Sequence, residues 1–182
     1  MKGILFQPRG KAVVLFVAVI AAASLFLTPS TSWAAMTSYL YLNGATQGAI
    51  HGDSTQSGRE DAIITYAYGH DVSMQGGVPV HGMVQITKHL DKSSPKLYQA
   101  LFTGESLTFH LDFFRINPEG SEELYYSVTL EGARIVSMKP WTPMTFLEEN
   151  KPYKDMELVG FDYDKIIWAE VIAGTSYEFT KP

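Results

Sequence analysis

The sequence predicts a mainly β fold, a small antiparallel β-barrel or sandwich with one flanking α-helix. About eight short runs of β-prone or alternating residues recur along the chain, and turn-forming residues separate them. One further segment carries the boundary signals of a helix. From Met36 onward 147 residues remain, which is enough for one domain with one sizeable core.

The helix is predicted just after Leu90. Ser93 or Ser94 can cap it by accepting a hydrogen bond from a free backbone N–H group, and Pro95 fits its first turn. Gly104 can close the far end in the left-handed conformation. We therefore expect a short helix with well-defined ends.

Before the helix, three runs rich in aromatic and β-branched residues predict strands: Tyr39–Leu42, Ala62–Tyr68 and Met83–Thr87. Two segments between them contain Gly without strand periodicity, and we expect them to be loops. These are Gly48–Gly58 and Asp71–Val80.

After the helix, Leu107–Ile116 has apolar odd positions as far as Phe113, which predicts a strand with one buried face. Asn117–Ser121 supplies turn residues, and Leu124–Leu130 is the expected antiparallel partner.

The C-terminal part is also predicted to be β. Ile135–Met138 is a shorter strand, and Pro140–Pro152 is a long loop whose three prolines keep it out of a central strand. Met156–Ile172 forms a strand pair or one long bent strand.

Residues 1–35 are expected to lie outside the fold. A basic start precedes the apolar run Ala12–Leu27 and a polar stretch that ends in small residues, which is the order of a secretory signal peptide cleaved after Ala34. A retained anchor is disfavoured, because the run has about 16 residues and a spanning helix needs roughly 20. A second interpretation stays open: Met36 is the true initiator and residues 1–35 come from a misassigned start.

Charge and composition exclude several classes of function. The net charge is −5, and it becomes −8 by the same count without Lys2, Arg9 and Lys11. Nucleic-acid binding is disfavoured, because it rests mainly on Lys and Arg neutralising phosphates. The chain has no cysteine, which excludes disulfides, thiolate nucleophiles and cysteine metal sites.

The residues that could take part in catalysis or metal binding are better explained by structural roles. The histidines have no metal-ligand spacing, although two of them flank one predicted strand; they are His51, His70, His81, His89 and His110. The glycines Gly44, Gly48, Gly52 and Gly58 follow no phosphate-loop pattern. Asp162 and Asp164 would share one face of a strand, as a glycosidase pair or a cation site could, with Lys165 available to pair with them.

There is no Gly-x-Ser-x-Gly elbow, and the abundant aromatic residues are expected in the core and at interfaces. We therefore expect no catalytic, cofactor-binding or metal-binding residues.

Several separated segments resemble one family. They are Tyr41–Gly44 with Gln47–Gly48, Ser57–Asp61, Lys88–Leu97, Phe113–Arg115, Tyr163–Trp168 and Ile172–Ser176. In this order and spacing, residues 36–182 resemble the haemolysin-coregulated proteins (Hcp), the tube subunits of bacterial type VI secretion.

The resemblance implies a β-barrel with one flanking helix that assembles into hexameric rings. It implies rings that stack into the inner tube, contacts with type VI sheath and spike proteins, and secretion with effector proteins in the lumen. No enzymatic activity, cofactor or stable membrane insertion is implied. A working leader would depart from this pattern, because it would send the protein to the periplasm.

Two other functions remain as alternatives. One is an exported monomeric β-barrel that binds a ligand such as a glycan, and the other is a hydrolase that uses Asp162 and Asp164. For the tube protein, the expected assembly surfaces are the loops Gly48–Gly58, Asp71–Val80 and Pro140–Pro152.

Overall fold

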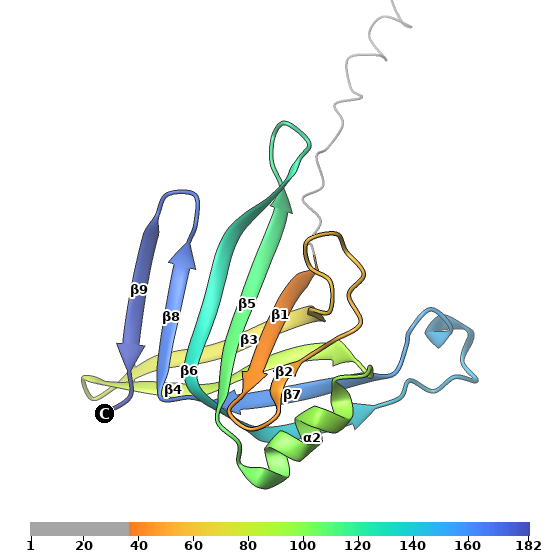
Figure 1. Cartoon of the computed structure of the whole chain (residues 1–182), viewed down its shortest axis with the longest axis horizontal. Helices are drawn as coiled ribbons and strands as arrows, with labels where there is room; N and C mark the ends of the chain where they lie inside the picture. Colours follow the sequence, from red (N-terminus) through yellow and green to blue (C-terminus); the bar gives the residue numbers. More distant parts are fainter. Residues whose placement is uncertain (1–36) are drawn as a thin grey trace, which may run out of the picture. The chain divides into compact units, whose positions relative to one another are not determined.

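The computed structural model describes residues 37–182 (Figure 1). The predicted signal peptide, residues 1–35, and the alternative start at Met36 lie outside the described residues. The described elements are β1 (Ser38–Gly44), β2 (Gly48–Ile50), β3 (Ile63–Gln75), β4 (Val78–His89), α2 (Ser94–Thr103), β5 (Leu107–Ile116), β6 (Glu122–Trp141), the 3-10 turn η2 (Glu148–Asn150), β7 (Met156–Asp162), β8 (Lys165–Glu170) and β9 (Thr175–Thr180).

Nine antiparallel strands form one continuous sheet, and six of them close into a ring in the order β1-β3-β4-β7-β6-β5. The ring is not a regular barrel. Strands β1, β5, β6, β8 and β9 form one layer, and β3, β4 and β7 cross it in a second layer (Figure 1). The predicted mainly β class with one helix is thus confirmed for residues 37–182.

Strand β6 joins the two layers because it changes partners along its length. Its first half pairs with β8 up to Glu131, and its second half pairs with β7 from Arg134 onward. Gly132 lies at the change with a φ of +62°, a conformation that side chains rarely adopt. A Cβ atom there would also meet the carboxylate of Asp164, an exposed side chain that would have to move, so the left-handed backbone is the main reason for glycine at this corner.

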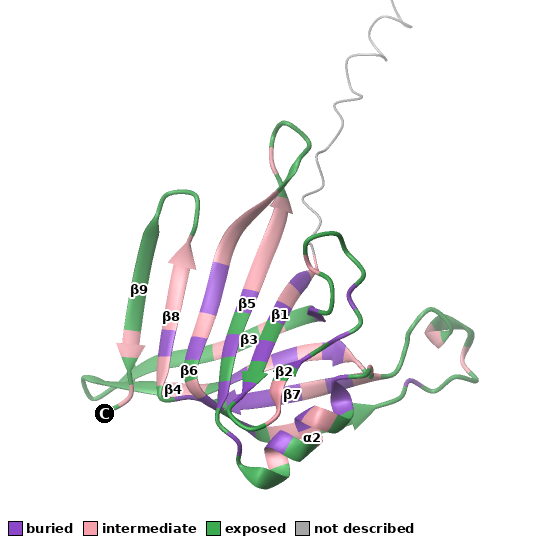
Figure 2. Ribbon diagram, in the orientation of Figure 1, coloured by how far each residue is buried: buried purple, intermediate pink, exposed green. Residues whose placement is uncertain are grey.

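The core lies between the two layers and is made of fully buried apolar side chains (Figure 2). Phe109 of β5 meets Phe161 of β7 edge to face, with ring centroids 5.0 Å apart. Leu97 and Ala100 bring the helix into the same core. Each such side chain contributes about 1.5–3 kcal/mol by leaving water. The other members include Leu40, Ile63, Val84, Ile86, Leu111, Val128, Leu130, Val159 and Ile166.

The helix has the predicted limits, but its N-terminus is not capped by the predicted hydrogen bond. Pro95 lies in the first turn, and Gly104 closes the helix at φ +64°. Ser93 is the N-cap residue, yet its hydroxyl donates to Asp91 Oδ1 at 2.5 Å and does not cap a helical N–H group. The Asp91 carboxylate accepts this hydroxyl more strongly than the hydroxyl could accept an amide, because it is charged.

The segment Asp71–Val80 is not a loop, so that prediction was wrong. Strands β3 and β4 continue to Gln75 and Val78 and join through Gly76 and Gly77, both with positive φ. Two consecutive residues with positive φ make the two-residue turn that matches the twist of a hairpin. The alternation was hard to read because neither face of the tip of this hairpin is buried.

Other strand limits also differ from the prediction. The two strands expected at Leu124–Leu130 and Ile135–Met138 are parts of the single 20-residue strand β6. Pro140 belongs to its end, opposite Glu157, so the long loop begins after Trp141. The block Met156–Ile172 is two strands that pair with different halves of β6 and not with each other.

Strands β2 and β9 were missed. Strand β2 has three residues inside the expected loop Gly48–Gly58, and β9 is exposed over most of its length. Within residues 37–182, no helix is long and apolar enough to cross a membrane.

Replacing Gly132 with Ala should lower the free energy of unfolding by about 1–3 kcal/mol, because the left-handed backbone and the contact with Asp164 both oppose a side chain. Gly69→Ala is the matched control, since a Cβ atom at Gly69 meets open space and its φ is ordinary. Urea unfolding of both variants measures the difference. Equal stability of the two variants would contradict the strained corner.

Candidate functional site

A buried ammonium group holds the helix to the sheet. Lys88, at the end of β4, is fully buried, and so is Glu157 of β7. The Lys88 Nζ donates to Glu157 Oε1 at 2.7 Å, Asp91 Oδ1 at 2.8 Å and the His89 carbonyl at 2.8 Å. Ser94 Oγ lies 3.2 Å from Nζ and donates to Glu157 Oε1 at 2.7 Å. This network joins β4, β7 and the start of α2 in one polar contact.

Exposed apolar side chains lie at two places outside the core. The hairpin surface is carried by the tip of β3 and β4 and consists of Val72 and Met74 on one face of the hairpin and Val78 and Val80 on the other, and Met74 is 66% exposed. The loop surface consists of Trp141, the last residue of β6, with Met144, Phe146 and Tyr153 after it, and Phe146 is 79% exposed. Apolar patches of this kind mark sites of contact with other proteins.

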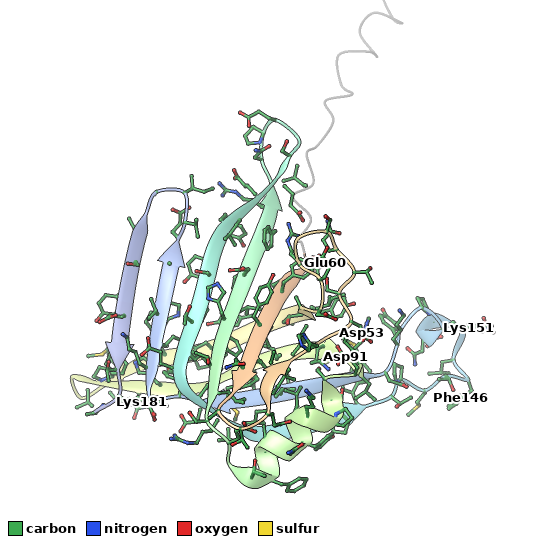
Figure 3. The ribbon with its side chains drawn as sticks, viewed as in Figure 1. Asp53, Glu60, Asp91, Phe146, Lys151 and Lys181 are labelled. Carbon is green, nitrogen blue, oxygen red and sulfur yellow. The ribbon has the colours of Figure 1, made fainter. Side chains whose placement is uncertain are left out.

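The two surfaces lie at opposite ends of the β3–β4–β7 layer. His89, at the end of β4, pairs with Met156, so the loop after β6 emerges at the end of β4 that is remote from the hairpin tip. The twelve residues from Val78 to His89 span roughly 36 Å in a strand. Figure 3 shows Phe146 and Lys151 on the loop at one end, and Lys181 close to the hairpin at the other.

The loop surface has internal order. The Leu147 N–H donates to the Met144 carbonyl at 3.2 Å, and Asn150 Nδ2 donates to the same carbonyl at 3.1 Å. Lys151 and Glu148 form an ion pair at 2.7 Å across η2. The loop can therefore present its apolar side chains at a low cost in ordering entropy.

The histidines lie at separate places, with one exception. His51 lies 3.9 Å from Asp61, and the His89 ring packs on Tyr66 at 4.2 Å. His70 and His81 meet at the hydroxyl of Tyr163. Among residues 37–182 there is no group of three or more His, Asp or Glu side chains placed to hold a metal ion.

His110 belongs to a chain of polar groups that the sequence did not reveal. Its Nε2 lies 2.9 Å from Asp112 Oδ1 and its Nδ1 lies 2.8 Å from Thr129 Oγ1. The Asp112 carboxylate raises the pKa of His110. The order acid, imidazole, hydroxyl is that of a hydrolytic triad, but the backbone groups beside it belong to the β5–β6 ladder and cannot serve an oxyanion.

Asp162 and Asp164 do not share a strand face. Asp162 ends β7 and is bound by Lys181, which lowers the pKa of the carboxyl. Asp164 lies in the following turn, 3.3 Å from Arg134. The expected pairing with Lys165 was wrong, because Lys165 reaches across to Glu178 and Glu131 on neighbouring strands, at 3.0 and 3.6 Å.

Comparison with known proteins places the chain in a family. A family model described as "Type VI secretion system effector, Hcp" matches residues 39–169. The chain belongs to the Hcp family. It is 35% identical over 156 residues to the major exported protein of Pseudomonas aeruginosa (strain PAO1), an alignment that covers 76% of this chain and 91% of that relative.

Solved Hcp structures share the fold. A crystal structure of an Hcp protein is 30% identical, with a TM-score of 0.75, and the match covers 79% of this chain and 96% of the other. The secreted protein Hcp3 from Pseudomonas aeruginosa is 31% identical, with a TM-score of 0.70 and coverage of 80% and 98%. The predicted family is thereby confirmed.

The segments that resemble Hcp proteins fix the loops of this domain. In Ser57–Asp61, the Arg59 guanidinium lies over the rings of Phe114 and Tyr39, 3.5 and 4.7 Å from their centroids. Arg59 also binds Glu122, and this hydrogen bond raises its pKa. The segment Ser57–Asp61, which ends the loop after β2, is thus tied to the β5–β6 hairpin.

The first of these segments, Tyr41–Gly44 with Gln47–Gly48, is held by Glu105, a residue that sequence reasoning missed. Glu105 Oε1 accepts the backbone N–H groups of Thr46 and Gln47 at 2.5 and 2.8 Å. The Gln47 side-chain amide donates to Glu105 Oε2 at 2.7 Å, and this bond, together with the two backbone bonds, lowers the pKa of Glu105. A Cβ atom on Gly44 would lie 2.5 Å from Glu105 Oε1, which explains glycine there. Gly48 at the start of β2 and Gly58 in a turn have positive φ, and Gly52 packs against the backbone of Ile63.

Replacing Lys88 with Met should lower the free energy of unfolding by about 3–5 kcal/mol, because it leaves the Glu157 carboxylate buried without its cation. The double replacement Lys88→Met with Glu157→Leu removes both charges and should recover most of the loss. A double-mutant cycle measured by urea unfolding tests this. Additive losses in the double variant would show that the two side chains do not act as a pair.

Proposed function

We propose that this Hcp protein is a structural subunit of the type VI secretion inner tube. Six copies form a ring, rings stack, and the tube is secreted with effector proteins. The proposal rests on the family, together with the observation that the hairpin surface and the loop surface lie at opposite ends of one layer. The subunit makes no chemistry of its own.

Two unlike surfaces at opposite ends favour head-to-tail association. A contact between different patches on successive copies continues from one subunit to the next, and it closes into a ring or extends into a filament. We propose that the hairpin surface of one copy packs against the loop surface of the next. The contact then covers the loop surface and the face of the hairpin tip that carries Val78 and Val80.

The other partners follow from the family. We propose contacts with the sheath and spike proteins of the secretion machine, and carriage of effectors in the lumen. The name of the Pseudomonas relative, major exported protein, supports secretion. The acidic balance of the chain opposes binding to nucleic acid.

The localisation depends on residues 1–35. Secretion through the machine is the proposal, and a cleaved leader would deliver the protein to the periplasm instead. The mass of the subunit purified from its own cells decides between a first residue at Met36 and one at Ala35.

A monomeric ligand-binding protein is the second candidate, and one observation favours it. A cleft of about 420 Å³ opens between β1, β5 and the segment before β3, and its lining includes Tyr41, His110, Thr129 and Glu60. Saturable binding of a glycan by a monomer would support this candidate.

Replacing Val78 with Asp, or Phe146 with Ser, should shift the protein from assemblies to monomers, because each change removes apolar area from one of the two surfaces. The free energy of unfolding should change by less than about 0.5 kcal/mol, since both side chains are exposed. Analytical ultracentrifugation and electron microscopy of annular particles measure assembly.

Phe102→Ser is the matched control, because Phe102 is 83% exposed on the helix and belongs to neither surface. It should assemble like the unaltered protein. An unaltered protein that stays monomeric at high concentration and shows no annular particles would refute the proposed function.

A further inference from the structure

Two histidines of the β3–β4 hairpin share one phenol hydroxyl. His81 Nδ1 lies 2.7 Å from the Tyr163 hydroxyl, and His70 Nε2 lies 2.8 Å from the same oxygen. Tyr163 follows β7 and is 1% exposed. The base of the hairpin is therefore tied to the turn between β7 and β8 by two hydrogen bonds that meet at one atom.

The same histidines stack on the neighbouring β8–β9 hairpin. The His81 ring lies on Phe179 with centroids 4.1 Å apart and planes 10° apart. The His70 ring lies on Trp168 at 5.9 Å and 25°. The rings thus fasten the β3–β4 hairpin to β8 and β9 from the side.

The hydrogen-bond donors and acceptors around the Tyr163 hydroxyl are matched one to one when both histidine rings are neutral. A neutral imidazole carries one N–H group and one nitrogen lone pair. One histidine can therefore accept the Tyr163 hydroxyl proton while the other donates an N–H to the hydroxyl oxygen, so each donor in the chain has one acceptor.

Protonating both rings breaks this match. Two N–H groups would point at one hydroxyl, whose own proton would lose its acceptor. The two rings, 5.7 Å apart, would also both be cations. Lys181 Nζ, 4.2 Å from the centroid of the Tyr163 ring, adds a third positive charge to this site.

Two acids offset part of this charge. Asp71 raises the pKa of His70, but it follows that residue on β3 and is exposed. Asp162 is occupied by Lys181. Tyr68 of β3 stays neutral, since burial raises its pKa to about 12. The positive charges therefore dominate the site when both histidines are protonated.

We propose that His70, Tyr163 and His81 form a pH-sensitive latch, which holds the β3–β4 hairpin against β8 and β9 when both histidines are neutral and releases it when both are protonated. The latch is a property of one chain. Its effect on assembly, through the hairpin surface, rests on the proposed function.

The direction of the pH dependence follows from the protons bound. Burial lowers the pKa of both His70 and His81 below the ordinary value of 6.5. The released hairpin therefore binds more protons in acid than the hairpin held against β8 and β9. The held hairpin loses stability as the pH falls from 6.5 through the lowered pKa values of the two histidines. His110 acts in the opposite sense, because Asp112 raises its pKa, but it lies on β5 away from the hairpin.

Hydrogen–deuterium exchange tests the latch, measured at pH 7.5 and 5.0 and corrected for the intrinsic rates. The chain carries Phe146→Ser throughout, so a failure of the proposed assembly cannot affect the result. Protection of the peptides that span residues 70–83 should be lower at pH 5.0 than at pH 7.5, because the released hairpin binds more protons than the hairpin held at Tyr163.

The double variant His70→Gln with His81→Asn keeps a neutral polar group near each ring nitrogen, and its exchange should not change between the two pH values. His89→Gln is the control, because burial lowers the pKa of His89 as well, at the far end of β4. It should retain the acid-induced loss of protection. Equal protection of the unaltered hairpin at both pH values would overturn the proposal.

An NMR titration of the histidine side chains covers the case in which the double variant does not fold. His70 and His81 should both titrate below 6.5 in the otherwise unaltered chain. Midpoints at or above 6.5 for either residue would also overturn the proposal.

Discussion

The structure depends on one buried charge, the ammonium group of Lys88. It lies where β4 ends, the helix begins and β7 starts, and every acceptor around it comes from one of these three segments. A buried ammonium without partners would cost far more than a domain of this size can offset. The network with Asp91, Ser94 and Glu157 therefore fixes how the helix and the second layer meet, and with them the end of the layer that carries the loop surface.

Local signals predicted the parts of the fold that have one buried face. The alternation around Phe109 identified the β5–β6 hairpin, and Pro95 and Gly104 identified the limits of the helix. Strand β9 and the tip of the β3–β4 hairpin have no buried face, so no hydrophobic period marks them. The continuity of β6 was missed because its glycine corner looks like an ordinary turn in the sequence.

The contacts of the candidate site could be predicted from the sequence even less well than the fold. The segment Lys88–Leu97 carries the family resemblance, but the partner that explains Lys88 is Glu157, 69 residues later. His70 and Tyr163 are 93 residues apart, and no spacing rule connects them. The expected loop Pro140–Pro152 does carry three of the four side chains of the loop surface, Trp141, Met144 and Phe146, although Pro140 and Trp141 still pair with β7 at the end of β6.

The central claim is that the hairpin surface of one copy meets the loop surface of the next. The chain has no cysteine, so single cysteines can be introduced without interference from native thiols. We would prepare Val78→Cys and Phe146→Cys separately, mix them in equal amounts and treat them with a short thiol cross-linker. The account predicts cross-linked dimers that contain one copy of each variant, and none from either variant alone. Cross-links that form equally well within one variant, or no cross-links in the mixture, would contradict it.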